Sequence, residues 1–236
     1  MHFIQLQNRL KIIKITHKAE ATHLGSALSA VDIIEGIYEV KKPKEKFILS
    51  AGHCASALYT VLENHGFLKN PNLHKLEYHP KRNKSLGIDL STGSLGQGLP
   101  IAVGMALADR KKKVYCLISD GECMEGSICE AIRVMTENNL INLIVVVNAN
   151  GYTAYKEADT NKLIKIFKGF GLKIRLVDGH NLKDLKKTLC SNNTKPTIIM
   201  AKTKVNQLPF LRGLSAHYYK MTKKDYQLAI KKWSKK

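Results

Sequence analysis

The chain has little of what marks secreted, membrane or metal-cluster proteins. No apolar run approaches the ~20 residues of a membrane-spanning helix, and no signal-peptide pattern is visible. The 5 cysteines are odd in number and form no Cys-x-x-Cys pair. This usage predicts reduced thiols in a cytoplasmic protein and excludes a disulfide framework.

Acidic residues are also scarce. There are 19 of them against 38 lysines and arginines, giving a formal net charge of +19. Such a charge can indicate nucleic-acid binding. However, only six of the basic residues are arginine, and the lysines are scattered from Lys11 to Lys236 without interleaved aromatic residues. This pattern favours a solvated surface over a nucleic-acid site, with some charge available to steer phosphorylated substrates or an acidic partner.

The remaining composition is that of a globular enzyme. Apolar residues make up 44% and charged residues 24% of the 236 residues. This is enough to bury a sizeable core, and no repeat or linker divides the chain. We therefore expect a single domain over residues 1–236.

Two short apolar runs predict buried strands. Residues 114–119 (VYCLIS) and 143–148 (LIVVVN) are too short for helices and rich in β-branched residues. Between them, residues 126–140 carry apolar residues on one helical face. The three segments predict a βαβ unit with parallel strands, whose carboxyl ends lie about 4.8 Å apart if the strands are neighbours.

Polar residues follow both predicted strands. Asp120 and Gly121 follow the first, and Asn150 follows the second. Carboxylate and amide oxygens suit Mg²⁺, and a glycine lets the backbone approach a phosphate near a helix N-terminus. The pattern therefore indicates a metal-diphosphate site. A plain Asp-Gly turn and a polar strand end are the alternative interpretation.

A glycine-rich loop and four histidines extend the pattern. Residues 91–110 (STGSLGQGLPIAVGMALADR) run from this loop into an alanine-rich helix, and glycines allow backbone to approach a flat ring or a neighbouring chain. Any one histidine alone would more often be structural. The four histidines lie at His23, His53, His79 and His217.

Together these motifs resemble the transketolase family. The resemblance runs from about Leu10 to Tyr218 and includes the turn at residues 177–180 (VDGH), but it covers only the N-terminal half of a full-length transketolase. It implies an α/β fold with a mostly parallel sheet flanked by helices on both faces. The chain is thus expected to be the N-terminal subunit of a heteromeric transketolase, which transfers a two-carbon ketol unit from a ketose to an aldose.

The same resemblance implies cofactors and partners. The cofactors would be thiamine diphosphate and Mg²⁺, which Ca²⁺ or Mn²⁺ can replace. A C-terminal subunit would supply the pyrimidine-binding domain and its glutamate, in a heterotetramer of two plus two chains. Sugars or sugar phosphates would be the substrates. The scattered lysines and the absence of a long apolar run lead us to expect neither nucleic acid nor a membrane as a partner.

Residue roles follow from the resemblance as well. The carboxylate of Asp120, the amide of Asn150 and the backbone carbonyl of Tyr152 would hold the metal. Catalytic proton transfer or substrate hydrogen bonding would fall to three histidines, whose ordinary pKa suits such work. These are His23, His79 and His217. Cofactor contacts would come from His53, Gly93, Ser94, Leu95, Gly121, Asn150 and His217.

Several departures keep alternatives open. Ser119 replaces the first glycine of the family's Gly-Asp-Gly, while Ala51 and Lys81 replace a lysine and a glutamate. Lys81 would favour a more anionic substrate or be a solvated surface charge. The alternatives are a specialised acceptor such as a nucleotide-linked sugar, a related thiamine diphosphate enzyme, and a non-catalytic scaffold. Cys54 is either a nucleophile or, as we prefer, a packing residue.

The ends of the chain also carry helical patterns. Residues 2–25 predict an amphipathic helix-like segment leading to His23. Residues 197–201 predict another buried strand, and residues 207–215 a loop that carries His217 to the site. Residues 219–236 predict an amphipathic helix capped by Thr222 and docked on its own domain.

Overall fold

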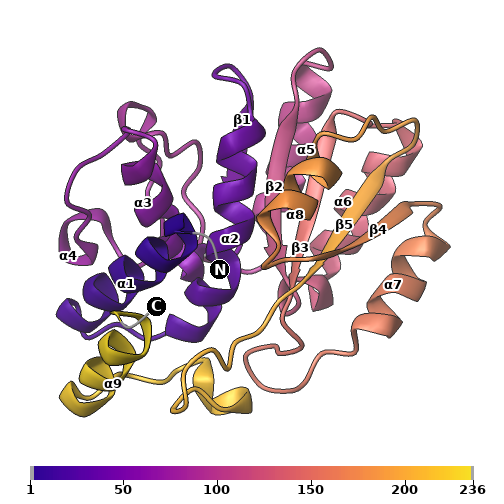
Figure 1. Ribbon diagram of the computed structural model, residues 1–236. Coiled ribbons are helices and arrows are strands. Elements are labelled where there is room, and N and C mark those ends of the chain that lie inside the picture. The colour runs from indigo at the N-terminus through magenta and orange to yellow at the C-terminus, as the bar shows by residue number, and fades with distance from the viewer. Residues whose placement is uncertain (1–2, 235–236) are drawn as a thin grey trace.

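The computed structural model describes residues 3–234 and has a five-stranded parallel sheet at its centre (Figure 1). Its strand order is β1-β2-β3-β5-β4, and every neighbouring pair is parallel. The expected fold class is therefore confirmed. The strands are β1 (Lys46–Leu49), β2 (Val114–Ser119), β3 (Leu143–Ala149), β4 (Lys173–Asp178) and β5 (Thr197–Lys202).

Helices cover both faces of the sheet (Figure 1). Alternate residues of each buried strand point to opposite faces, so Tyr115 and Leu117 join one apolar cluster while Cys116 and Ile118 join another. The first cluster packs under α1 (Phe3–Lys18), α2 (Leu24–Val40), α3 (Ala55–Asn64), α8 (Leu182–Leu189) and α9 (Lys223–Ser234). The second packs under α5 (Gly98–Ala108), α6 (Gly126–Glu137) and α7 (Thr160–Gly169). In the described part of the chain, a one-turn helix, α4 (Leu73–Leu76), and four short 3₁₀ segments lie in connections.

The predicted βαβ unit is present and its two strands are neighbours. Ser119 pairs with Asn148, so Asp120 and Asn150 leave the sheet at the same edge. Helix α6 ends earlier than predicted, at Glu137. Asn139 adopts a left-handed conformation (φ 46°), which terminates the helix and turns Leu140 back into the core.

Both terminal helices form, with one difference from the prediction. Helix α1 ends at Lys18, and a turn separates it from His23; His2 lies outside the described residues. At α9 the Thr222 hydroxyl accepts from the Asp225 amide (3.2 Å), while the Asp225 carboxylate accepts from the Thr222 amide (3.0 Å). This reciprocal cap confirms the predicted role of Thr222. No helix within residues 3–234 is long and apolar enough to cross a membrane.

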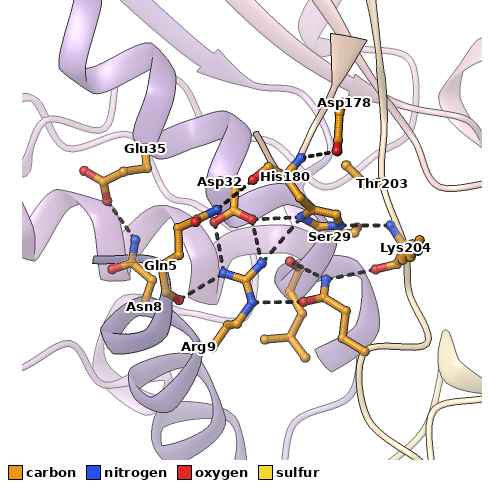
Figure 2. Close-up of polar contacts among 12 residues, drawn as sticks. Gln5, Asn8, Arg9, Ser29, Asp32, Glu35, Asp178, His180, Thr203 and Lys204 are labelled. Atoms are coloured by element: carbon orange, nitrogen blue, oxygen red, sulfur yellow. Dashed lines mark hydrogen bonds and ion pairs between the residues drawn. The ribbon is translucent and has the colours of Figure 1, made fainter. Parts of the chain in front are cut away.

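A buried charged network joins α1, α2 and the turn after β4 (Figure 2). The Arg9 guanidinium donates to both carboxylate oxygens of Asp32 (3.0 and 2.5 Å), and His180 Nδ1 lies 2.8 Å from Asp32. Arg9 is 3% and Asp32 0% exposed. Burial alone would raise the pKa of Asp32, but hydrogen bonds from His180 and Arg9 outweigh it and lower that pKa.

The same network reaches the exit of β5. His180 Nε2 accepts from the backbone amide of Lys204 (3.1 Å), and Arg9 also donates to Gln207 (3.0 Å). Residues 203–207 begin the segment that returns the chain to His217. The network therefore fixes the path of that segment as well as the α1–α2 contact.

Removing the arginine from this network should strongly destabilise the chain. Arg9→Met leaves the Asp32 carboxylate buried without its bidentate partner, so we expect a loss of about 3–5 kcal/mol in the free energy of unfolding. Urea denaturation measures it. Arg133→Met is the matched control, because Arg133 forms an exposed pair with Glu137 within α6 and should change stability by less than about 1 kcal/mol. Equal effects for the two variants would contradict the structural importance of the network.

Candidate active site

The carboxyl ends of β1, β2 and β3 surround one cavity of about 180 Å³. Parallel sheets place their ligand sites at this edge. The structure brings nine of the predicted site residues to the cavity wall, namely His23, His53, His79, Gly93, Leu95, Gly121, Asn150, Tyr152 and His217. Ser94 is exposed and does not line the cavity. Asp120 lies beside the wall and is fully buried.

Asp120 is placed as a metal-binding carboxylate would be. Its Oδ2 accepts from the Gly151 amide at 2.7 Å, while its buried Oδ1 has no hydrogen-bond partner. Burial raises the pKa of Asp120 to about 7, although the amides of residues 150–152 oppose the shift. A nearby cation would stabilise the ionised form, since an opposite charge lowers a carboxyl pKa.

The neighbouring oxygen donors complete this arrangement. Asn150 Oδ1 accepts from the Tyr152 amide at 3.0 Å, so the amide side chain is held in the turn that follows β3. Within residues 3–234, no group of three or more His, Cys, Asp or Glu side chains could hold a metal. A carboxylate, an amide and a backbone carbonyl form a sparse oxygen set, and Mg²⁺ in phosphate sites keeps few protein ligands. The residues present therefore fit Mg²⁺ bound together with a diphosphate.

Gly121 leaves open space at the cavity wall. A Cβ there would lie 3.7 Å from Thr153 Cα and 3.9 Å from Ser119 Oγ, which are ordinary contacts. Packing within the chain therefore does not demand a glycine. Both Ser119 and Thr153 also line the cavity, so a side chain at position 121 would take up room beside the site. The glycine thus leaves room beside the cavity that a larger side chain would fill.

Three histidines form a cluster in the cavity. The ring centroid of His23 lies 5.4 Å from that of His53 and 4.7 Å from that of His217. The backbone amide of His23 donates to the carbonyl of His217 (3.1 Å), which ties the start of α2 to the C-terminal segment. His23 also has a left-handed backbone (φ 62°), a strained conformation that is common at functional sites.

Burial keeps these histidines neutral. Burial, with a smaller contribution from the neighbouring histidines, lowers the pKa of His53 to about 3 and that of His23 to about 4. Burial also lowers the pKa of His217. A neutral imidazole has one donor and one acceptor nitrogen, so the cluster is suited to hydrogen-bond substrate hydroxyls near neutral pH.

The glycine-rich loop is packed tightly against the site. A Cβ on Gly93 would lie 3.1 Å from the ring of His79, the fourth predicted histidine, which is itself exposed. Gly96 has a φ of +78°, and a Cβ there would lie 2.5 Å from Ser127 Oγ. These contacts explain the glycines through packing, whereas the sequence alone suggested ligand or neighbouring-chain approach.

Glu122 is an important residue that the sequence analysis missed. Its carboxylate is fully buried and accepts from the Ser50 hydroxyl, the Gly96 amide (3.1 Å) and the Ser119 amide (3.0 Å). Burial raises its pKa, and these hydrogen bonds oppose the shift. Ser119 Oγ in turn lies 3.4 Å from the Glu122 amide, so the serine that departs from the family's motif has a structural partner. The acid is visible in the sequence, but no sequence pattern indicates that its carboxylate is buried.

Burial also separates the other residues that differ from the family's motifs. Ala51 is fully buried, whereas Lys81 is exposed and does not line the cavity. Cys54 is buried and burial raises the pKa of its thiol, so it packs and is not an activated nucleophile.

Tyr218 is a second cavity residue that was not predicted from the sequence. It lines the cavity with 61% exposure, and its ring centroid lies 4.6 Å from that of His217.

Comparisons with known proteins agree with this geometry. Residues 4–217 match the family model described as transketolase, thiamine diphosphate binding domain, and the chain belongs to this family. Two relatives are each named as one subunit of an apulose-4-phosphate transketolase. The one from Phocaeicola vulgatus is 30% identical over 98% of this chain and 92% of its own length, and the one from Actinobacillus succinogenes is 32% identical over 92% and 89%.

Single-chain transketolases are similar over part of their length. Human transketolase is 34% identical over 83% of this chain, but only 36% of its own length is covered. The crystal structure of transketolase from Campylobacter jejuni superposes with a TM-score of 0.81 at 26% identity, covering 99% of this chain and 43% of that one. The chain therefore spans less than half the length of these transketolases.

Because His53 and His23 are neutral in the folded chain, we expect acid to lower its stability. Because the folded pKa values of His53 and His23 lie below the ordinary 6.5, unfolding takes up protons. Their contribution to stability is therefore present above about pH 6.5 and lost as the pH falls toward 4 and 3. As the pH falls, the free energy of unfolding should decrease less steeply in His53→Gln than in the wild type. The two slopes should differ by up to about 1.4 kcal/mol per pH unit, because the variant lacks one group that takes up a proton on unfolding.

Urea denaturation between pH 7 and 4.5 measures this slope. His74→Gln is the control, because His74 is exposed on α4 and should leave the slope of the wild-type chain unchanged. A His53→Gln slope equal to that of the wild type would show that His53 is protonated in the folded chain.

Proposed function

We propose that this chain is the diphosphate-binding subunit of a heteromeric transketolase, which transfers a two-carbon ketol unit from a ketose to an aldose. The observation that carries the proposal is the buried, unpartnered Oδ1 of Asp120 beside Asn150, at the edge where the histidines gather. The family supplies the cofactor class, thiamine diphosphate. The metal would be Mg²⁺, held by Asp120, Asn150 and the carbonyl of Tyr152, with Ca²⁺ or Mn²⁺ as substitutes.

Each group in the cavity has a task in this proposal. When bound at this edge, thiamine diphosphate would supply the nucleophilic carbon and the electron sink that ketol transfer needs. Gly121 would leave room for it at the cavity wall. Gly93, Ser94 and Leu95 would contact it through backbone and apolar groups, with His53 as a further contact. His23, His79 and His217 would bind sugar hydroxyls and move protons at the substrate's oxygen atoms.

The cavity itself indicates which part of a substrate this chain recognises. Among residues 3–234, no lysine or arginine lines it, while four histidines and Tyr218 do. These groups hydrogen-bond hydroxyls better than they neutralise a phosphate. A sugar phosphate, such as the one in the names of the two bacterial relatives, would need its phosphate bound by another chain. The same holds for a nucleotide-linked sugar.

A second chain is therefore part of the proposal. The two relatives that match nearly the whole chain are named as subunits, and the longer transketolases continue far beyond the matched region. We propose a partner that supplies the pyrimidine-binding domain and its glutamate, in a cytoplasmic assembly of two plus two chains. This chain would contribute one domain to each active site.

A non-catalytic scaffold is the competing function. It would keep the fold without needing an unpaired carboxylate oxygen at the sheet edge, because burying such a group costs free energy. The neutral histidine cluster around a cavity is likewise unnecessary for a scaffold. Both features favour an enzyme.

Reconstitution tests the proposal. The candidate partner is a chain that carries the pyrimidine-binding domain and its glutamate. When the two chains are mixed with thiamine diphosphate and Mg²⁺, they should transfer ketol units between sugars. This chain alone should not. Asp120→Asn should lower the rate by about 100-fold or more, because it removes the charge that holds the metal. Glu130→Gln, an exposed carboxylate on α6, is the control and should keep the wild-type rate. Full activity of the isolated chain, or of Asp120→Asn with partner, would contradict the proposal.

A further inference from the structure

A second cavity lies at the opposite edge of the sheet from the candidate active site. It has a volume of about 320 Å³ and is bounded by the first residues of β1 and β2, Lys46 and Val114. Ligand-binding pockets begin at about this volume. We call it the basic cavity. Its lining comprises Lys44, Lys46, Arg82, Lys84, Asp89, Met105, Ala108, Asp109, Lys112, Lys113 and Val114.

The two acids of the basic cavity are already occupied. Asp89 pairs with Lys46 at 2.8 Å and its second oxygen accepts from the Phe47 amide at 3.2 Å. Asp109 pairs with Lys112 at 2.5 Å, and this contact lowers its pKa. Neither carboxylate is free to neutralise the remaining cations.

Four cations remain around this cavity. Over residues 3–234, no acidic side chain forms an ion pair with Lys44, Arg82, Lys84 or Lys113. They come from three separate segments of the chain: the turn before β1, the segment after His79, and the turn before β2. Like charges held around one concave surface raise the local positive potential and attract a multivalent anion.

Part of the cavity lining is apolar. Met105 and Ala108 of α5 and Val114 of β2 line the cavity together with the cations. Arginine and lysine side chains bind phosphate through charge-assisted hydrogen bonds. We propose that the basic cavity binds a multiply charged phosphate anion, either a free polyphosphate or the phosphate chain of a nucleotide, at a site separate from the cofactor.

One chain segment joins this cavity to the candidate active site. Residues 79–93 carry His79 and Gly93 to the active-site cavity, and Arg82, Lys84 and Asp89 to the basic cavity. The segment is anchored at its two ends, where the Thr92 amide donates to the Pro80 carbonyl (3.1 Å) and the Thr92 hydroxyl donates to the Leu49 carbonyl (2.6 Å). A bound anion would thus touch the segment that positions His79.

Calorimetric titration with tripolyphosphate and with ATP tests the proposal. EDTA is present throughout, so that the proposed metal-diphosphate site lacks its cation. We expect one anion per chain, with affinity that falls as salt is added. Arg82→Gln/Lys84→Gln should weaken binding at least about tenfold, because it removes two of the four unpaired cations.

A charge-matched variant distinguishes the site from the general positive charge. Lys223→Gln/Lys224→Gln removes two exposed lysines at the start of α9 and should leave binding unchanged. Binding of both probes would identify the phosphate chain as the recognised part, and binding of ATP alone would identify a nucleotide.

Two outcomes would overturn the proposal. They are no binding of either probe and equal weakening in the two double variants. Circular dichroism confirms that each variant is folded. Cofactor binding and ketol transfer are not used as readouts, so failure here leaves the transketolase proposal standing, and the reverse also holds.

Discussion

The buried carboxylate of Glu122 is the constraint on which the candidate active site depends. It accepts hydrogen bonds from Ser50 after β1, from Gly96 in the glycine-rich loop and from Ser119 at the end of β2. These three segments are distant in sequence, and the one carboxylate is hydrogen-bonded to all of them. Because a buried carboxylate is costly unless its lone pairs are satisfied, all three donors must be in place together. The glycine loop is thereby held against the sheet edge from which Asp120 and Asn150 project.

A second buried polar network holds other segments that lead to the site. Arg9, Asp32 and His180 connect α1, α2 and the turn after β4, and His180 accepts from the amide of Lys204. The chain continues from Lys204 to His217, whose carbonyl accepts from the His23 amide. The apolar core thus builds the sheet and its two helical layers, whereas buried polar groups fix where the loops at its carboxyl edge lie. The apolar core and the buried polar groups together place the histidine cluster.

The sequence predicted those parts of the structure that are local. The strands around residues 114–119 and 143–148, the intervening helix and the Thr222 cap depend on periodicity and neighbouring residues, and they are confirmed with small shifts at the ends. The four histidines came from a resemblance to a family, and the structure places them around one cavity. The burial of Glu122, the Asp32 network and the position of Tyr218 depend on contacts between distant segments. No pattern along the chain contains that information, and the four-residue strand β1 and the sheet order were missed for the same reason.

Calorimetric titration of thiamine diphosphate with Mg²⁺ tests the central claim, that this sheet edge is half of a cofactor site. The titration is made into the wild-type chain and into Asp120→Asn, each alone and each with the candidate partner. We expect that binding appears or tightens sharply when the partner is added to the wild-type chain, and that Asp120→Asn loses it. Equal cofactor affinity for the wild type and Asp120→Asn would contradict the metal assignment, and no binding to any combination would favour the non-catalytic relative.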